Sequence, residues 1–329
     1  MKVFEIQPGS TSLDGIRPGE REKPGPGPGE VLVRMRAASL NYRDLAVATG
    51  RYFGGAAKAP LIPMSDGAGE IEAVGQGVTG LAVGDRVVGA FASGNPPAPL
   101  GSPYDGVLTE YRVFTEDGVT KFPAHLSFEE ASTMPCAGVT AWNGLFEGKI
   151  CKPGETVLAL GTGGVSIWAL QLAKAAGARV IITSSSDEKL ERAKKLGADD
   201  VINYKTTPKW PDEVTRLTGG EGADHIIEVG GSGTLPFSYQ SVGRGGEIAL
   251  IGVLTQPQGD LSPHPLMLKG ASLRGIFVGQ RELLVRLCRA VDVNKIHPVV
   301  DTTFAFDKAL DAFKYLQSAK HFGKVVITI

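Results

Sequence analysis

A glycine-rich turn between an apolar strand and a helix is the part of this chain best suited to bind a reactive group. The expected strand covers residues 157–160, and the turn reads Gly161-Thr162-Gly163-Gly164. A helix follows, and a second apolar strand covers residues 179–183. In this layout, backbone N–H groups at the helix N-terminus receive the pyrophosphate of a dinucleotide. We therefore predict dinucleotide binding by Gly161, Thr162, Gly163, Gly164 and Val165.

The end of the second strand indicates which dinucleotide binds. An NAD-binding unit usually carries an acidic residue there, which holds the ribose 2′-hydroxyl. Here the strand ends in Thr183-Ser184-Ser185-Ser186, and Lys189 follows one helical turn later. Hydroxyl groups and a cation suit a 2′-phosphate, so the sequence predicts NADP(H), bound by Ser184, Ser185 and Lys189. The serines could also cap the helix expected from Asp187, which is compatible with phosphate binding.

Strands and helices alternate from about residue 127 onward. Helices are expected at 164–176 and 187–196, each followed by a C-capping glycine. Further strands are expected at 200–204, 224–229, 247–251 and 272–278. This alternation predicts an α/β fold, a doubly wound parallel Rossmann sheet with helices on both faces.

The first part of the chain, to about residue 123, is rich in short strands. They are expected at 31–37, 69–75 and 85–89, bounded by glycine as in a small β-barrel. Pro/Gly-rich surface loops are expected at 18–29 and 95–103. A final helix (306–317) and strand (324–329) are assigned to this first domain, because the Rossmann unit is already complete.

Length and composition limit the function classes. The 329 residues suggest two domains, which we place at 1–125 with 279–329 and at 126–278. With 34 basic and 35 acidic residues, the chain offers no electrostatic case for nucleic acid or a membrane surface. The sequence shows neither a bilayer-spanning apolar run nor a signal peptide. Cys136, Cys151 and Cys288 resemble reduced thiols, so a cytoplasmic location is expected.

Nearly the whole chain resembles the medium-chain dehydrogenase/reductases, the superfamily of alcohol dehydrogenases and quinone reductases. Besides the glycine turn, the resemblance rests on motifs in the right order and spacing: Ala38-Ser39-Leu40-Asn41-Tyr42-Arg43-Asp44, Gly67-Ala68-Gly69-Glu70, Gly84-Asp85-Arg86-Val87, Cys136-Ala137-Gly138-Val139-Thr140-Ala141 and Leu196-Gly197-Ala198-Asp199. It implies a GroES-like β-barrel catalytic domain joined to the Rossmann domain, with the active site in the cleft between them.

The chain departs from the zinc-dependent members at the metal ligands. Those members bind catalytic zinc through a Cys, a His and a further Cys; the matching positions here are Asn41, Ser65 and Cys136. Zinc sites take three or four ligands from Cys, His and carboxylate, so we expect no catalytic zinc. The stretch that would carry four cysteines for structural zinc, 91–106, contains none. Cys136 is interpreted as a small buried residue, with a reactive thiol as the alternative.

Other positions resemble the zinc-independent quinone oxidoreductases. These place an Asn and a Tyr beside the nicotinamide, which makes Asn41 and Tyr52 the expected catalytic residues here. Asn41 could instead hold a loop, and Tyr52 could be a core aromatic. Asp44 is expected to be structural, paired with a base such as Lys324. The remaining expected cofactor contacts are Thr140, Tyr204, Gly252, Val253, Val278 and Lys324.

Two expectations concern regions with weaker signals. Ser166 replaces the third glycine of the dinucleotide motif, which should shift the helix slightly without abolishing binding. The acceptor pocket is expected to be lined by the loops 51–57, 95–104 and 255–266.

Without zinc, charge on the acceptor oxygen can be stabilised only by hydrogen-bond donors. The expected function is therefore NADPH-dependent hydride transfer to an electron-poor acceptor, a quinone or an α,β-unsaturated carbonyl. A zinc-free carbonyl reductase or alcohol dehydrogenase, and a non-catalytic, crystallin-like NADPH-binding protein, are the alternatives. The resemblance also implies a homodimer in which the strand 272–278 pairs across a two-fold axis, covering an exposed edge.

Overall fold

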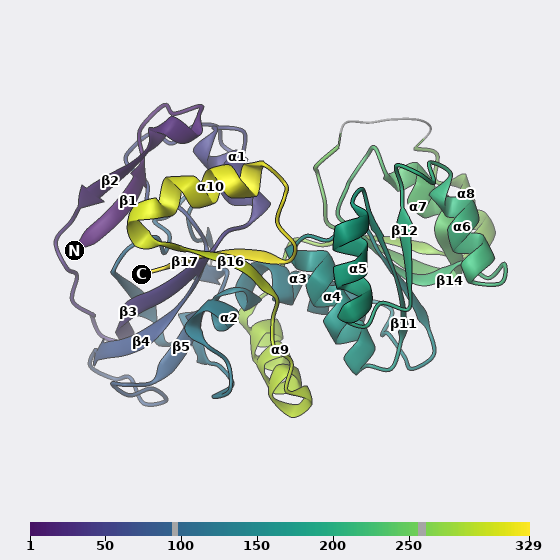
Figure 1. Cartoon of the computed structure of the whole chain (residues 1–329). Coiled ribbons are helices and arrows are strands. Elements are labelled where there is room, and N and C mark those ends of the chain that lie inside the picture. Colours follow the sequence, from purple (N-terminus) through teal and green to yellow (C-terminus); the bar gives the residue numbers. More distant parts are fainter. Residues whose placement is uncertain (94–97, 256–260) are drawn as a thin grey trace. The chain divides into compact units, whose positions relative to one another are not determined.

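The computed structural model describes residues 1–93, 98–255 and 261–329. The chain divides into two compact units: unit 1 is Met1–Val139 with Gly279–Ile329, and unit 2 is Thr140–Val278 (Figure 1). The second junction lies where the sequence placed it. The first lies later than the expected 125/126, because α2 (Phe128–Ser132) packs on strands of unit 1. The Ser39 hydroxyl donates a 2.9 Å hydrogen bond to the Ser132 carbonyl and ties α2 to them.

A six-stranded parallel sheet forms the centre of unit 2. Its spatial order is β12-β11-β10-β13-β14-β15. The strands are β10 (Thr156–Ala159), β11 (Arg179–Ser184), β12 (Asp200–Asn203), β13 (Ala223–Glu228), β14 (Val242–Leu250) and β15 (Ser272–Gly275). The order reverses between β10 and β13, and ligands of such sheets bind at the carboxyl ends of the strands at this point. The predicted doubly wound Rossmann sheet is confirmed.

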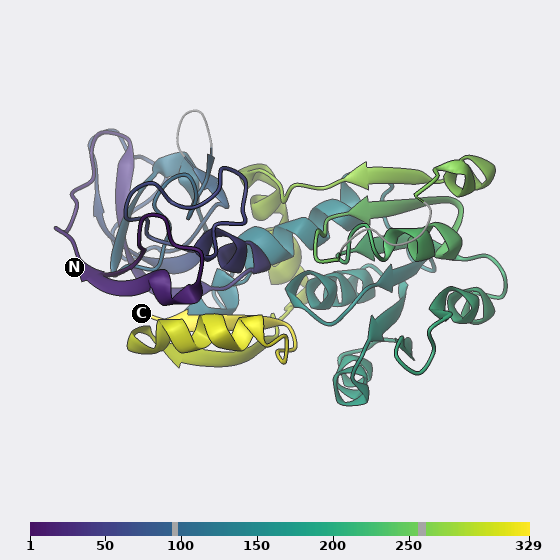
Figure 2. The same cartoon turned by 90° about the horizontal axis from the view of Figure 1, so that it is seen from above.

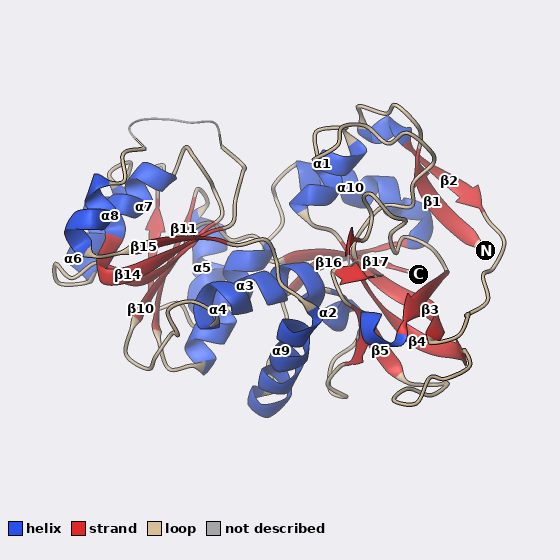
Figure 3. Ribbon diagram, turned by 180° about the vertical axis from the view of Figure 1, so that it is seen from behind, coloured by secondary structure: helices blue, strands red, loops and turns tan. Residues whose placement is uncertain are grey.

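Helices cover both faces of this sheet (Figure 3). They are α3 (Val139–Phe146), α4 (Gly164–Ala175), α5 (Asp187–Lys195), α6 (Trp210–Leu217), α7 (Leu235–Ser241) and α8 (His264–Lys269). On the central strand β10, Val157, Leu158 and Ala159 are each 0% exposed. Side chains of both faces are therefore buried, which requires helices on both sides of the sheet. Sequence reasoning predicted α4 and α5 but not α6, α7 or α8, which are short. It also extended β15 to Val278, whose φ of 52° is incompatible with a strand.

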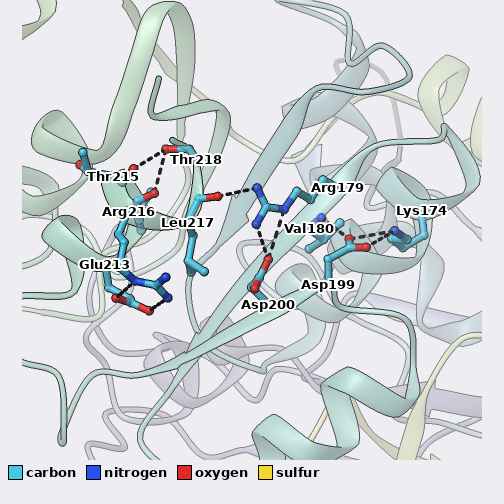
Figure 4. Close-up of polar contacts among 11 residues, drawn as sticks. Lys174, Arg179, Val180, Asp199, Asp200, Glu213, Thr215, Arg216, Leu217 and Thr218 are labelled. Carbon is cyan, nitrogen blue, oxygen red and sulfur yellow. Dashed lines mark hydrogen bonds and ion pairs between the residues drawn. The ribbon is translucent and has the colours of Figure 1, made fainter. Parts of the chain in front are cut away.

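Asp199, the last residue of the Leu196-Gly197-Ala198-Asp199 motif, joins α4 to β11 (Figure 4). Lys174 Nζ donates to both carboxylate oxygens of Asp199 at 3.0 and 2.8 Å, and the Val180 backbone N–H donates to Oδ2 at 2.7 Å. Beside it, Arg179 pairs with Asp200 at 2.6 Å. These bonds fix the amino ends of β11 and β12. The Leu196-Gly197-Ala198-Asp199 motif therefore stabilises the fold at the end of the sheet opposite the expected cofactor site.

Unit 1 is built on a seven-stranded sheet in the order β16-β17-β3-β4-β5-β9, with β8 also paired to β3. The strands are β3 (Glu30–Ser39), β4 (Asp66–Val74), β5 (Arg86–Gly89), β8 (Tyr111–Thr115), β9 (Val119–Lys121), β16 (Val300–Ala305) and β17 (Lys324–Thr328). Its helices besides α2 are α1 (Tyr42–Ala48), α9 (Arg281–Asn294) and α10 (Ala309–Gln317). α10 packs along β16 and β17 (Figure 2), which makes the C-terminal segment part of this unit, as predicted.

The two predicted surface loops need correction. Pro18–Glu20 belongs to β2 (Ile16–Glu20), which pairs antiparallel with β1 (Lys2–Ile6); a proline is tolerated there because β2 is an edge strand. Of the second loop, residues 95–97 lie outside the described residues. The rest includes β7 (Ala98–Pro99), paired with β6 (Ala92–Ser93), and Leu100, which is 1% exposed.

The predicted final helix begins later than expected, at α10, because residues 306–308 form a 3-10 turn. None of the helices within the described ranges combines the length and the apolar composition needed to cross a bilayer.

Candidate active site

The glycine turn of unit 2 leaves the N-terminus of α4 open. Gly161 has φ of +75°, a left-handed conformation that favours glycine, and its N–H donates to the Thr183 hydroxyl at 3.2 Å. Gly163 is the N-cap residue, and a Cβ added at either glycine would meet no atom within 4 Å. The backbone of both glycines is therefore open to close approach, as pyrophosphate binding at the first N–H groups of α4 would require.

Ser166 is accommodated by a hydrogen bond. Its hydroxyl donates to the Leu160 carbonyl at 2.6 Å, and the residue is 1% exposed. The bond links the first turn of α4 to the end of β10, and the helix still begins at Gly164. The serine thus provides close helix–strand packing, the task that the third glycine has in the dinucleotide motif.

The residues predicted to hold the 2′-phosphate gather at the carboxyl ends of β11 and β12. The N-cap of α5 is Ser186, whose hydroxyl accepts a hydrogen bond from the Lys189 N–H at 3.4 Å. Ser184 is buried at the end of β11, and Ser185 beside it is half-buried. Tyr204 is 42% exposed, and its N–H donates to the Ser184 carbonyl at 3.1 Å. Sequence positions twenty residues apart are therefore brought together by the β11–β12 pairing.

An acidic group near this end was missed by the sequence argument. Asp187, at the first position of α5, accepts a hydrogen bond from the Asn203 side chain at 2.7 Å. It is exposed, so an NAD ribose could use this carboxylate in place of the acidic residue that the end of β11 lacks. The sequence signal for this carboxylate was an acidic residue directly after the serine run, at Asp187.

The loops after β13 and β14 are shaped by a buried carboxylate that sequence reasoning also missed. Glu228, 0% exposed, accepts hydrogen bonds from four groups: the N–H of Gly230 (2.8 Å), the N–H of Gly231 (2.9 Å), and the hydroxyls of Thr234 (2.6 Å) and Ser238 (2.5 Å). The predicted cofactor residue Gly252 follows β14, where an added Cβ would lie 1.6 Å from the Val229 carbonyl oxygen. Its neighbour Val253 is 77% exposed.

Thr140 and Val278 lie where the chain passes into and out of unit 2. Thr140 is 2% exposed in the first turn of α3. The Val278 carbonyl accepts a 2.7 Å hydrogen bond from Asn143 Nδ2 on the same helix. This bond holds the two chain segments together.

In unit 1 the predicted catalytic residue Asn41 is the N-cap of α1. Its backbone N–H donates to Asp44 Oδ2 at 2.8 Å, completing a capping box. Lys324 from β17 is 3% exposed, and its ammonium donates to Asn41 Oδ1 at 2.5 Å and to the Leu40 carbonyl at 2.6 Å. Asp44 does lie beside a base, but its ion-pair partner is Arg43 at 3.6 Å, and Lys324 acts on it at longer range. The adjacency of Arg43 and Asp44 in the sequence favours this pair.

The contact with Lys324 fixes which way the Asn41 amide points. An ammonium group only donates hydrogen bonds, so the atom it meets must be the amide oxygen. The amide nitrogen Nδ2 then lies on the other side, buried and without a hydrogen-bond partner among the described residues. Buried donors in folded proteins are nearly always satisfied, and an acceptor atom of a ligand would satisfy this one.

Tyr52 and Arg43 lie close together. The Arg43 guanidinium is 4.8 Å from the centre of the Tyr52 ring and 5.1 Å from that of Phe91, and it donates to the Leu100 carbonyl at 2.8 Å. Tyr52 also packs against the core of unit 1. These contacts are compatible with the expected catalytic role of Tyr52 and also with the alternative, a core aromatic.

The surroundings of the three positions that match zinc ligands are unfavourable for a bound zinc ion. The Asn41 oxygen faces an ammonium group, and the Ser65 hydroxyl donates to Asp66 Oδ1 at 2.6 Å. Asp66 Oδ2 accepts the Cys136 N–H at 3.0 Å. Burial, with the Asp66 charge added, raises the pKa of the Cys136 thiol, whereas zinc requires a thiolate. An amide and a hydroxyl hold two of the three positions, and Lys324, which is 3% exposed, stays against one of them, so the ligand set that zinc takes in proteins is missing.

Comparisons with known proteins agree with this geometry at the level of the fold. The family of alcohol dehydrogenase GroES-like domains matches residues 27–124, and the family of zinc-binding dehydrogenases matches 164–291. The chain is 46% identical to a zinc-type alcohol dehydrogenase-like protein of Schizosaccharomyces pombe over 97% of this chain and 96% of that protein. It is 33% identical to 2-methylene-furan-3-one reductase of Solanum lycopersicum over 91% of this chain and 71% of that enzyme.

Two solved structures are similar over the full length of both chains. An NAD-dependent alcohol dehydrogenase has a TM-score of 0.94 at 34% identity, covering 100% of each chain. A mycobacterial protein in complex with NADPH has a TM-score of 0.85 at 28% identity, also covering 100% of each chain. The first is named for NAD, whereas the second was solved with NADPH.

Proposed function

The chain belongs to the medium-chain dehydrogenase/reductases, a superfamily of nicotinamide-dependent oxidoreductases, and we propose that it is an NADPH-dependent reductase of quinones or α,β-unsaturated carbonyls that works without zinc. The observation that carries the proposal is the Asn41 amide. Lys324 holds its oxygen, so the buried, unpartnered Nδ2 is offered to an acceptor oxygen.

When bound, NADPH supplies a hydride to the acceptor. Asn41 Nδ2 would donate to the acceptor oxygen, where negative charge develops as the hydride arrives. Lys324 would keep the amide oriented and polarise it through Oδ1. The Tyr52 phenol is proposed as a second donor. A site with neutral donors stabilises this charge less than a metal does, which favours acceptors that are already electron-poor.

The preference for NADPH over NADH is supported by the carboxyl ends of β11 and β12. Ser184, Ser185 and Tyr204 lie there, Lys189 follows in α5, and the strand ends in hydroxyl groups where a carboxylate would select NAD. The similarity to an NAD-dependent alcohol dehydrogenase favours the opposite choice. That similarity also supports the second candidate function, a carbonyl reductase or alcohol dehydrogenase of the same fold.

One experiment tests both candidates. NADPH and NADH oxidation are followed with quinone, enal and simple ketone acceptors, and metal content is measured in the same sample. The proposal expects NADPH-dependent turnover of quinones or enals by protein without zinc. Rapid turnover of a simple ketone or secondary alcohol would favour the second candidate, and activity that requires added zinc would refute the zinc-free mechanism.

A homodimer is proposed from the exposed edge of the unit 2 sheet. β15 is the last strand in the order, Leu273 on it is 37% exposed, and Phe277 just beyond it is 62% exposed. Pairing with a second copy would cover this edge. Multi-angle light scattering should give twice the chain mass, and a monomer would refute the proposal. The three free cysteines support the proposed cytoplasmic location.

A further inference from the structure

A compact group of ionisable side chains lies at the amino ends of β10 and β13. Cys151 and Glu155 precede β10, His225 is on β13, and Lys149 reaches in from the loop after α3. Because the strands are parallel, this edge of the sheet is opposite the glycine turn. Within residues 1–93, 98–255 and 261–329, this is the one place where three side chains with metal-ligating atoms come within 4.8 Å of one another.

The group is already arranged around a positive charge. The Lys149 ammonium lies 2.8 Å from Glu155 Oε1, 3.4 Å from Asp224 Oδ1 and 3.4 Å from His225 Nε2. His225 Nε2 lies 2.9 Å from the second Glu155 oxygen. The Nδ1 atom of this histidine, which is 1% exposed, has no hydrogen-bond partner among the described residues. The nitrogen of His225 that faces Glu155 and Lys149 is Nε2, so this atom is the one placed to bind a metal beside Glu155.

We propose that Cys151, Glu155 and His225 form a binding site for a thiophilic divalent metal ion such as Zn²⁺, with Lys149 giving way when the ion binds. Sulfur, imidazole and carboxylate together are the donors that zinc takes in proteins. Tetrahedral zinc with ordinary bond lengths places its ligand atoms about 3.5 Å apart. The three atoms need to move inward only modestly from their present spacing of up to 4.8 Å.

The charge balance of the group favours a divalent ion. Lys149 and the carboxylates of Glu155 and Asp224 leave one net negative charge when Cys151 is a thiol and His225 is neutral. Binding of a divalent ion with release of the thiol proton adds one net positive charge. The metal-bound group is then neutral even with Lys149 still protonated nearby, so the ion removes an uncompensated charge from a partly buried place.

The site is open to solvent on one side. The side chains of Lys149, Glu155 and Asp224 are 26%, 19% and 37% exposed, whereas Cys151 and His225 are buried. An ion can therefore approach past the carboxylates and reach the thiol and imidazole behind them. Lys149 can move aside, because its stem is flexible and its head can return to water, but it gives up its ion pairs with Glu155 and Asp224.

Cobalt titration of the full chain, freed of metal by a chelator, tests the proposal. Co²⁺ bound to a thiolate gives a near-ultraviolet charge-transfer band, which reports the ligand directly. The wild type should show a band that saturates at one Co²⁺ per chain. Cys151→Ser should lose the band, and Glu155→Gln should weaken binding about tenfold or more. Cys288→Ser, a change at another buried cysteine, should bind as the wild type does.

Lys149→Met separates a metal site from a simple ion-pair network. Removal of the competing cation should tighten Co²⁺ binding about tenfold if the metal takes its place. Unchanged or weaker binding by this variant would overturn the proposal, as would a wild type without a saturable band. A band that disappears in Cys136→Ser but persists in Cys151→Ser would also overturn it, and would contradict the zinc-free function as well. Failure of the acceptor panel alone would leave this site unaffected.

Discussion

The ammonium group of Lys324 lies 2.5 Å from the side-chain oxygen of Asn41, although 283 residues separate them in the sequence. Both residues are buried, and the contact leaves the Asn41 amide nitrogen as an unused donor. The position that holds a zinc-ligating cysteine in related dehydrogenases here holds an oriented amide.

Replacing Asn41 by Asp should remove the proposed donor while sparing the fold. Aspartate keeps an N-capping oxygen and an acceptor for Lys324 but has no N–H group. We expect kcat with the best acceptor of the panel to fall about 100-fold, the effect of losing one such donor. Steady-state kinetics and thermal unfolding of the same sample check this. Near-normal kcat in a stable Asn41→Asp variant would exclude the amide as the donor.

Lys324→Met should leave the side-chain amide of Asn41 free to rotate, because the hydrogen bond that fixes its oxygen is lost. Either the amide oxygen or the amide nitrogen can then face the acceptor. A roughly tenfold lower kcat with an unchanged KM for NADPH is expected, since part of the donor's contribution is lost. Lys320→Met, a change at an exposed lysine nearby, is the matched control. If the KM for NADPH rises and kcat does not change, Lys324 is instead the cofactor residue that the sequence predicted.

Asp44 should make the folded state less stable as pH rises from about 4 to 6. Burial raises the pKa of this carboxyl group to about 6, against the opposing charge of Arg43, from an ordinary value of 3.8. Between these values the unfolded state has already lost the proton that the folded state retains, so the free energy of unfolding falls with pH. The full effect is about 3 kcal/mol, from 1.36 kcal/mol per pKa unit.

Asp44→Asn removes this titration and provides the measurement. Urea unfolding at several pH values should show the stability difference between wild type and variant changing between pH 4 and 6 and constant above about pH 7. Parallel pH profiles for the two proteins would show that Asp44 keeps an ordinary pKa.

Ser185→Asp should turn the cofactor preference toward NADH. A carboxylate at this position repels the 2′-phosphate and can accept the ribose 2′-hydroxyl, so the NADPH/NADH ratio of kcat/KM should fall about 100-fold. Lys189→Ala should raise the KM for NADPH and leave that for NADH unchanged, with Lys195→Ala on the same helix as control. A ratio that does not move in either variant would place the 2′-phosphate elsewhere.

Glu228→Ala should destabilise unit 2. The substitution leaves two backbone N–H groups and two hydroxyls without their acceptor, and we expect a loss of about 3 kcal/mol or more in the free energy of unfolding. Glu228→Gln, which keeps one acceptor oxygen, should cost less. Urea unfolding checks both, with the exposed Glu221→Ala as reference. Equal stability of Glu228→Ala and Glu221→Ala would contradict the proposed role.

The Rossmann half was readable from the sequence because its signals are local. Apolar runs that end in glycine place β10, α4 and β11 within a residue or two of their predicted bounds. Local signals fail where the structure depends on a distant partner. Pro18–Glu20 looked like loop but pairs with β1, and the first domain boundary moved because α2 packs on strands far from it in sequence.

The sequence by itself determined the superfamily and the Rossmann fold, because turn glycines and strand ends act on their immediate neighbours. The serines and lysine predicted to bind a 2′-phosphate stay a prediction. Only the tertiary structure decided the state of Asn41. β17 pairs with β3, the strand that leads into α1, and this pairing brings Lys324 beside the Asn41 amide. A buried charge takes whatever acceptor the fold places next to it, and the sheet register sets that neighbour rather than any sequence spacing.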